Sequence, residues 1–150
     1  MSKTVFEVMT PYPQTIDKSA NVVEAARLMK EHDVGSLPVV EQNEMPGGHG
    51  VNRLVGIVTD RDVAIRVVAE RLDPKTVQVE QIFSDHPATA WPDEDLDEAL
   101  ERMAELRVRR LPVVDDDRLV GMLAQADLAH VAKDKKVAHL VDAISEPTAP

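Results

Sequence analysis

Two stretches of the chain carry apolar residues with the spacing of an amphipathic helix. In each stretch they fall at positions i, i+3, i+4 and i+7, so that they share one helix face. The two sets are Val22, Ala25, Ala26 and Met29 in the first half of the chain, and Leu96, Ala99, Leu100 and Met103 in the second. Ser19 and Asp93 precede the two helices and are of the residue types that cap helix N-termini.

Short apolar runs bounded by turn residues predict the strands that accompany these helices. They are Thr15–Ile16, Leu37–Glu41 and Arg53–Thr59 in the first half, and Thr89–Ala90, Leu111–Asp115 and Arg118–Leu123 in the second. A further helix is predicted after the last strand of each half, over Asp60–Glu70 and Gln125–Ala132. Each half is therefore a β-α-β-β-α unit of the mixed α/β (α+β) class. A unit of about 60 residues is too small to bury its sheet alone, so we expect the two to pack as a pseudo-two-fold pair.

The two halves are copies of one another. Residues 5–40 align without a gap on residues 79–114, and Leu37-Pro38-Val39-Val40 falls on Leu111-Pro112-Val113-Val114. The offset then drops from 74 to 65 residues, because the first copy carries a Gly-, Pro- and Asn-rich loop insert within 41–52. An internal repeat of this kind indicates a duplicated domain. We therefore predict one domain over 1–72, with this insert, and a second over 73–150, which ends in a C-terminal helix.

Composition and charge exclude several function classes. The 150 residues include no cysteine, and the five histidines show no ligand spacing, so we expect no metal site. No apolar run is long enough to span a membrane or to form a signal peptide, which predicts a cytoplasmic protein. The net charge of −10, of which residues 76–150 carry −8, argues against nucleic acid as a partner. No catalytic motif or cofactor-binding loop is present, so we predict no enzyme.

The motifs of both copies resemble the CBS-domain family, over nearly the whole chain. In the first copy the resemblance rests on Val8-Met9-Thr10-Pro11, Val34-Gly35-Ser36-Leu37-Pro38-Val39-Val40 and Leu54-Val55-Gly56-Ile57-Val58-Thr59-Asp60-Arg61-Asp62. In the second it rests on Val108-Arg109-Arg110-Leu111-Pro112-Val113-Val114 and on Leu119-Val120-Gly121-Met122-Leu123-Ala124-Gln125-Ala126-Asp127-Leu128. It implies a stand-alone tandem pair, or Bateman module, that binds an adenosine nucleotide in clefts between its units and forms a homodimer.

The resemblance also implies which residues contact the nucleotide. In the first copy they are Thr15, Ile16, Ser36, Leu37, Pro38, Thr59, Asp60, Arg61 and Asp62. In the second copy they are Thr89, Ala90, Arg109, Arg110, Leu111, Pro112, Ala124 and Asp127. The implied role of Asp62 is to accept hydrogen bonds from both ribose hydroxyls.

The strand-to-helix corner at Thr59 suits a nucleotide on chemical grounds as well. Thr59 stands at an N-cap position, where unpaired N–H groups and the helix dipole favour a phosphate. Gly56 would let a ligand or a strand approach closely. The structural alternative is that Thr59 and Asp62 only cap the helix.

The second copy departs from this pattern. Ala124 replaces the threonine and is a poor N-cap, so we predict a tighter site at Asp62 and a weaker or empty one at Asp127. Arg109 and Arg110 suit a phosphate through paired hydrogen bonds, or else they balance neighbouring acids on the surface.

Two functions from different classes follow. The first is a regulatory module, such as an energy sensor, that binds AMP, ATP or an S-adenosylmethionine-type ligand. The alternative is a nucleotide-free dimeric module of a stress response, whose acidic second half contacts an unknown protein partner. We expect Val63, Val67 and their counterparts to leave an apolar helix face that a second copy covers.

Overall fold

The computed structural model of the chain describes residues 3–43 and 51–125. The predicted helices over 125–132 and near the C-terminus lie outside these residues, apart from Gln125, and so does Asp127. The chain divides into two compact units. One comprises residues 14–87, and the other combines the residues up to Pro13 with those from Ala88 onward.

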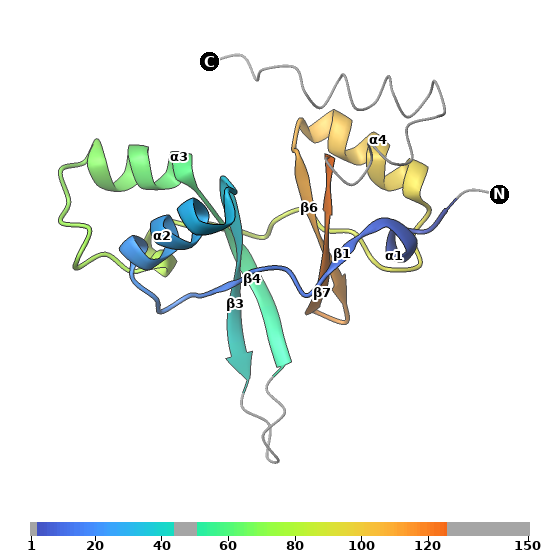
Figure 1. Cartoon of the computed structure of the whole chain (residues 1–150), viewed down its shortest axis with the longest axis horizontal. Helices are drawn as coiled ribbons and strands as arrows, with labels where there is room; N and C mark the ends of the chain where they lie inside the picture. Colours follow the sequence, from blue (N-terminus) through green and yellow to red (C-terminus); the bar gives the residue numbers. More distant parts are fainter. Residues whose placement is uncertain (1–2, 44–50, 126–150) are drawn as a thin grey trace. The chain divides into compact units, whose positions relative to one another are not determined.

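The unit of residues 14–87 consists of a small sheet with helices packed on it (Figure 1). Its strands are β2 (Ile16–Asp17), β3 (Ser36–Asn43), β4 (Val51–Thr59) and β5 (Ser84–Asp85). Its helices are α2 (Val22–His32) and α3 (Asp60–Val63), followed by a π-helical turn at Ala64–Val68 and a 3-10 turn at Val79–Gln81. β3 lies between β2, which runs parallel to it, and the antiparallel β4, which β5 flanks in turn.

The other unit repeats this arrangement. It contains α1 (Val5–Val8), β1 (Thr10–Pro11), α4 (Leu96–Leu106), β6 (Arg110–Asp115) and β7 (Arg118–Ala124). β7 pairs with β6 and β1, both antiparallel, and Ala90 makes a parallel bridge to Val113 as β2 does to β3. Asp116 and Asp117 join β6 to β7 with φ of 52° and 67°, the pattern of a two-residue type I′ hairpin.

The mixed α/β class is confirmed, and most predicted elements within the described residues form, with differences at their ends. The predicted strand Thr89–Ala90 is reduced to a single bridge at Ala90. β3 and β4 extend to Asn43 and Val51, so the outer residues of the predicted 41–52 loop belong to the hairpin. The helix caps are Asn21 and Asp95, and the prediction of Ser19 and Asp93 is wrong. Ser19 instead donates its N–H and hydroxyl to Oδ1 of Asp17, in the turn before the helix.

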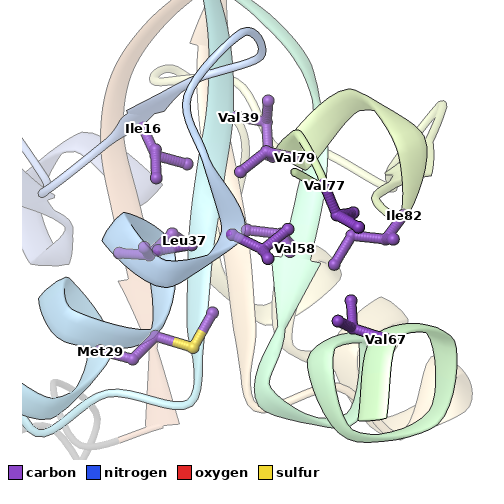
Figure 2. Close-up of a cluster of buried hydrophobic side chains, with 11 residues drawn as sticks. Ile16, Met29, Leu37, Val39, Val58, Val67, Val77, Val79 and Ile82 are labelled. Atoms are coloured by element: carbon purple, nitrogen blue, oxygen red, sulfur yellow. The ribbon is translucent and has the colours of Figure 1, made fainter. Parts of the chain in front are cut away.

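Each copy sends its N-terminal segment to the core of the other copy. Val5 is fully buried in a cluster with Leu100 and Met103, and its N–H donates to the Glu94 carbonyl at 2.9 Å. Val79 and Ile82 are buried with the side chains of β3 and β4, as Figure 2 shows. The predicted boundary between residues 72 and 73 therefore separates the two sequence repeats. In the compact units, the first segment of each repeat packs in the core of the other repeat.

The π-helical turn after α3 changes which apolar residues face solvent. Val67 is fully buried and Val63 is half-buried, so the prediction that they form an uncovered face is wrong. Ala69 N–H donates to the carbonyl of Ala64, five residues back, and the extra residue in this turn alters the helical phase. Ile65 and Val68 are 50% and 69% exposed instead.

Candidate ligand-binding corners

The predicted site residues of the first copy meet at one end of β3. Ser36 pairs with Thr59 across the β3–β4 ladder, and Asp60 N–H donates to the Gly35 carbonyl at 2.9 Å, which closes the corner. On the other side of β3, Ile16 is in register with Val39. The stretches that this register brings together are Thr15–Ile16, Ser36–Pro38 and Thr59–Asp62.

Only part of this set has accessible side chains. Ile16, Leu37 and Pro38 are buried, and Figure 2 shows Ile16 and Leu37 in the core cluster. These three residues could offer only their main chain. Side chains that are at least partly accessible are those of Thr15, Ser36, Thr59, Asp60, Arg61 and Asp62.

Thr59 and Asp62 form a reciprocal capping box at the start of α3. Thr59 N–H donates to Oδ2 of Asp62 at 2.9 Å, and Asp62 N–H donates to Oγ1 of Thr59 at 3.1 Å. The other carboxylate oxygen of Asp62, Oδ1, lies 3.6 Å from Nε of Arg66, longer than a hydrogen bond. The capping role is therefore confirmed. It occupies Oδ2, whereas Oδ1 makes the looser ion pair with Arg66, and the Asp62 side chain is 13% exposed.

The second copy builds the same corner with different side chains. Arg110 pairs with Ala124 across the β6–β7 ladder, and Gln125 N–H donates to the Arg109 carbonyl at 3.0 Å. Ala90, Leu111 and Pro112 are buried, whereas Arg109 is exposed and Thr89, Arg110 and Ala124 are half-buried. The structure thus brings together the predicted residues of each copy within its own unit, apart from Asp127.

Sequence reasoning missed a charged cluster next to Thr89. Glu94 is a charged residue buried to 3% exposure, and the Arg102 guanidinium binds its carboxylate with both Nη atoms, at 2.6 and 2.9 Å. Arg102 also donates to the Thr89 carbonyl at 2.8 Å and lies 5.6 Å from the ring centre of Trp91. The hydrogen bond with Glu94 raises the pKa of Arg102 above its ordinary value.

A comparison of the two copies could have revealed this cluster. At the repeat offset of 74, Glu94 aligns with Ala20, Arg102 with Leu28 and Trp91 with Asp17. Asp17 makes a local contact instead, because its carboxylate accepts the Ser19 hydroxyl at 2.6 Å and the Ser19 N–H at 2.9 Å. These hydrogen bonds lower the pKa of Asp17.

Both copies match the model of the CBS domain family, over residues 5–69 and 79–134. The chain is a pair of CBS domains. It is 40% identical to the CBS domain-containing protein YhcV of Bacillus subtilis over 84% of this chain and 83% of that protein. It is also 32% identical to hypoxic response protein 1 of Mycobacterium tuberculosis over 97% of this chain and 96% of that protein. Both relatives match over most of their own length. The chain is a CBS pair of the regulatory type.

Solved CBS structures share the fold of the pair. A crystal structure of Hypoxic Response Protein I with two coordinated zinc ions matches with a TM-score of 0.73 and 31% identity, over 85% of this chain and 98% of that one. CBSX2 in complex with AMP matches with a TM-score of 0.70 and 28% identity, over 86% and 95%. The CBS pair of MJ0100, with 5'-methylthioadenosine and S-adenosylmethionine, matches with a TM-score of 0.71 and 27% identity, over 87% and 96%.

Within residues 3–43 and 51–125, no three His, Asp or Glu side chains are grouped so that they could hold a metal ion. The helices in these ranges include none that is long and apolar enough to cross a membrane.

Proposed function

We propose that this CBS pair is a non-catalytic, cytoplasmic regulatory module that binds an adenosine-type ligand at its strand-to-helix corners. The observation that carries the proposal is the carboxylate of Asp62. One of its oxygens is held by Thr59 N–H, which orients the group, and the other has only a loose 3.6 Å contact with Arg66. An oriented carboxylate oxygen is a strong acceptor for the hydroxyl groups of a ribose.

Two similar proteins support the choice of ligand class. CBSX2 has been solved with AMP, and the CBS pair of MJ0100 with 5'-methylthioadenosine and S-adenosylmethionine. These ligands share an adenosine moiety and differ in charge, so the ribose is the group that one carboxylate could recognise in all of them. We therefore propose the adenosine moiety as the shared determinant.

Calorimetry with AMP, ATP, 5'-methylthioadenosine and S-adenosylmethionine tests this proposal. In Asp62→Asn the remaining side-chain oxygen can still cap Thr59 N–H, but the amide in place of Oδ1 no longer accepts a hydrogen bond. We expect this variant to bind about tenfold more weakly than the unaltered chain, with an almost unchanged melting temperature. Unchanged affinity in Asp62→Asn, or a larger loss in Asp127→Ala than in Asp62→Ala, would contradict the assignment.

We further propose that the protein is a homodimer, and the exposed apolar residues near α3 support this. Ile65 and Val68 belong to the π-helical turn and Leu72 follows it, and the three are 50%, 69% and 48% exposed. A second copy that covered these side chains would remove apolar surface from water, which favours association. The same surface favours the nucleotide-free interaction module as the second candidate, should calorimetry detect no adenosine-type ligand.

A further inference from the structure

The buried carboxylate of Glu94 depends on Arg102. The Glu94 side chain is 1% exposed, and the Arg102 guanidinium donates to both of its oxygens from Nη1 and Nη2. Because a buried charge without a partner is costly, this pair holds the guanidinium in one place. Arg102 belongs to α4, and Glu94 precedes that helix, so the pair fixes a cation at the edge of the unit's core.

The fixed guanidinium holds the segment from Thr89 to Trp91 in two further ways. Nη2 donates to the Thr89 carbonyl at 2.8 Å, and the guanidinium lies 5.6 Å from the centre of the Trp91 ring. Between these two residues, Ala90 N–H donates to the Pro112 carbonyl, and the Ala90 carbonyl accepts from Val114 N–H, both at 2.9 Å. The segment is therefore joined to β6 through its main chain, to α4 through Arg102, and to Glu94 through Trp91 N–H, which donates to Oε2 at 3.3 Å. Arg102→Lys, which keeps Glu94, thus tests the contribution of Arg102 alone.

The first copy lacks this connection. Leu28 aligns with Arg102 and has no group that could donate to the Thr15 carbonyl. That carbonyl accepts from the side chain of the adjacent residue, Gln14, at 3.2 Å and in an exposed position. The two units thus hold equivalent segments by different means.

We propose that Arg102 is a positioning residue that fixes the Thr89–Trp91 segment of the second unit in the conformation that binds a ligand. The inference rests on the proposed function and on the family resemblance, which implies that Thr89 and Ala90 contact the ligand. A segment that is already ordered loses less conformational entropy when a ligand binds, so the unit binds that ligand with higher affinity. Arg102 would act through the main chain of this segment, without touching the ligand.

Two altered chains separate positioning from simple stability. Glu94→Ala combined with Arg102→Leu installs the pair found in the first copy, Ala20 and Leu28, so no buried charge is left unpaired. Arg102→Lys retains a positive charge for Glu94 but lacks the planar fork that reaches Thr89 at the same time. Arg118→Leu, at an exposed position of the same unit, is the control for the loss of one positive charge.

Two measurements are made on each chain. Hydrogen exchange of the Ala90 amide reports how firmly the segment is held in the absence of ligand. Fluorescence of Trp91, the only tryptophan of the chain, is titrated with AMP. We expect exchange about tenfold faster, and AMP binding at the second corner about tenfold weaker, in the double variant and in Arg102→Lys, with no change in Arg118→Leu.

The outcomes distinguish this inference from the proposed function. Unchanged Ala90 exchange in both the double variant and Arg102→Lys would overturn the positioning role. Faster exchange with unchanged AMP affinity would overturn it as well, because the segment would then not contribute to binding. If the unaltered chain binds neither AMP nor S-adenosylmethionine by calorimetry, the proposed function is wrong, and Ala90 exchange still decides whether Arg102 holds the segment.

Discussion

Gly56 and Gly121 occupy equivalent positions in the two units. In each unit a short antiparallel strand pairs with the longer strand at the glycine. A Cβ atom on Gly56 would collide with the ring of Phe83 and lie 2.5 Å from the Ser84 carbonyl oxygen. On Gly121 it would collide with the sulfur of Met9. Of the two partners that the sequence allowed at Gly56, a ligand or a strand, the structure therefore contains the strand.

The neighbours of the two glycines predict unequal costs for an added methyl group. Gly56→Ala should destabilise the fold by about 3 kcal/mol, because an aromatic ring and a main-chain oxygen cannot both move away. Gly121→Ala should cost about 1 kcal/mol, because the Met9 thioether can change its rotamer. Denaturant unfolding measures both, with Gly35→Ala as a control whose nearest contact is the exposed Asp60 carboxylate at 3.2 Å. Equal losses for Gly56→Ala and Gly121→Ala would contradict this argument.

At the scale of elements, α2 is linked to a distant part of the chain through its own N-cap. The Asn21 Oδ1 accepts from Val23 N–H, which caps the helix. The Nδ2 of the same side chain donates to the carbonyls of Pro74 and Lys75, both at 2.9 Å, and to that of Val77 at 3.2 Å. One amide thus caps α2 and holds the segment that joins the two repeats.

Serine and alanine at position 21 separate these two contributions. Asn21→Ser can still cap α2 but loses the hydrogen bonds to the linker carbonyls, and we expect a loss of roughly 1 kcal/mol because water replaces part of them. Asn21→Ala loses the cap too and should cost about 1 kcal/mol more. Thermal unfolding compares the two variants. If both are equally stable, Asn21 does not act as a cap.

At the scale of the whole molecule, the exchange of N-terminal segments makes each unit depend on residues from the other repeat. Val5 is fully buried with α4 and β6 of the second repeat, and Val79 is fully buried with α2 and β3 of the first. Neither repeat therefore completes its core from its own consecutive residues.

Truncation of each valine should destabilise the opposite repeat. Val5→Ala should affect the second repeat, and Val79→Ala the first. Val5→Ala and Val79→Ala should each destabilise by roughly 2 kcal/mol, as buried large-to-small changes do. Hydrogen exchange measured by mass spectrometry should show faster exchange in residues 96–115 for Val5→Ala, and in residues 16–43 for Val79→Ala. The reverse pattern would show that the segments are not exchanged.

The proposed homodimer is a second prediction at this scale. Light scattering at micromolar concentration should give about twice the chain mass of 16.6 kDa. Val68→Glu places a charge among the exposed apolar residues near α3 and should give the monomer mass, because burial of an unpaired charge is unfavourable. Leu106→Glu, which alters an exposed apolar residue on α4, is the control and should remain dimeric. A monomer mass for the unaltered chain would refute the homodimer.

Periodicity and the internal repeat were sufficient to predict most of the secondary structure. The helices at 22–32 and 96–106 and the hairpins that follow them depend on local spacing of apolar residues, which is visible in the chain itself. The helix caps were misplaced by two residues, because several polar residues precede each helix and only the structure shows which of them bonds to its first turn. The π-helical turn was missed for a similar reason, since one extra residue in a turn leaves no mark on the pattern.

The sequence by itself determined the duplication and the CBS family, because both depend on motifs and a repeat that can be read along the chain. Only the tertiary structure decided which core each N-terminal segment completes, since an apolar residue such as Val5 or Val79 does not specify in the sequence which apolar cluster it joins. It also decided that Arg102 joins Glu94 to Thr89, because residues 8 and 13 positions apart meet only once α4 is packed on its sheet. Hydrophobic spacing specifies faces of elements, and contacts between distant side chains depend on how those faces are assembled.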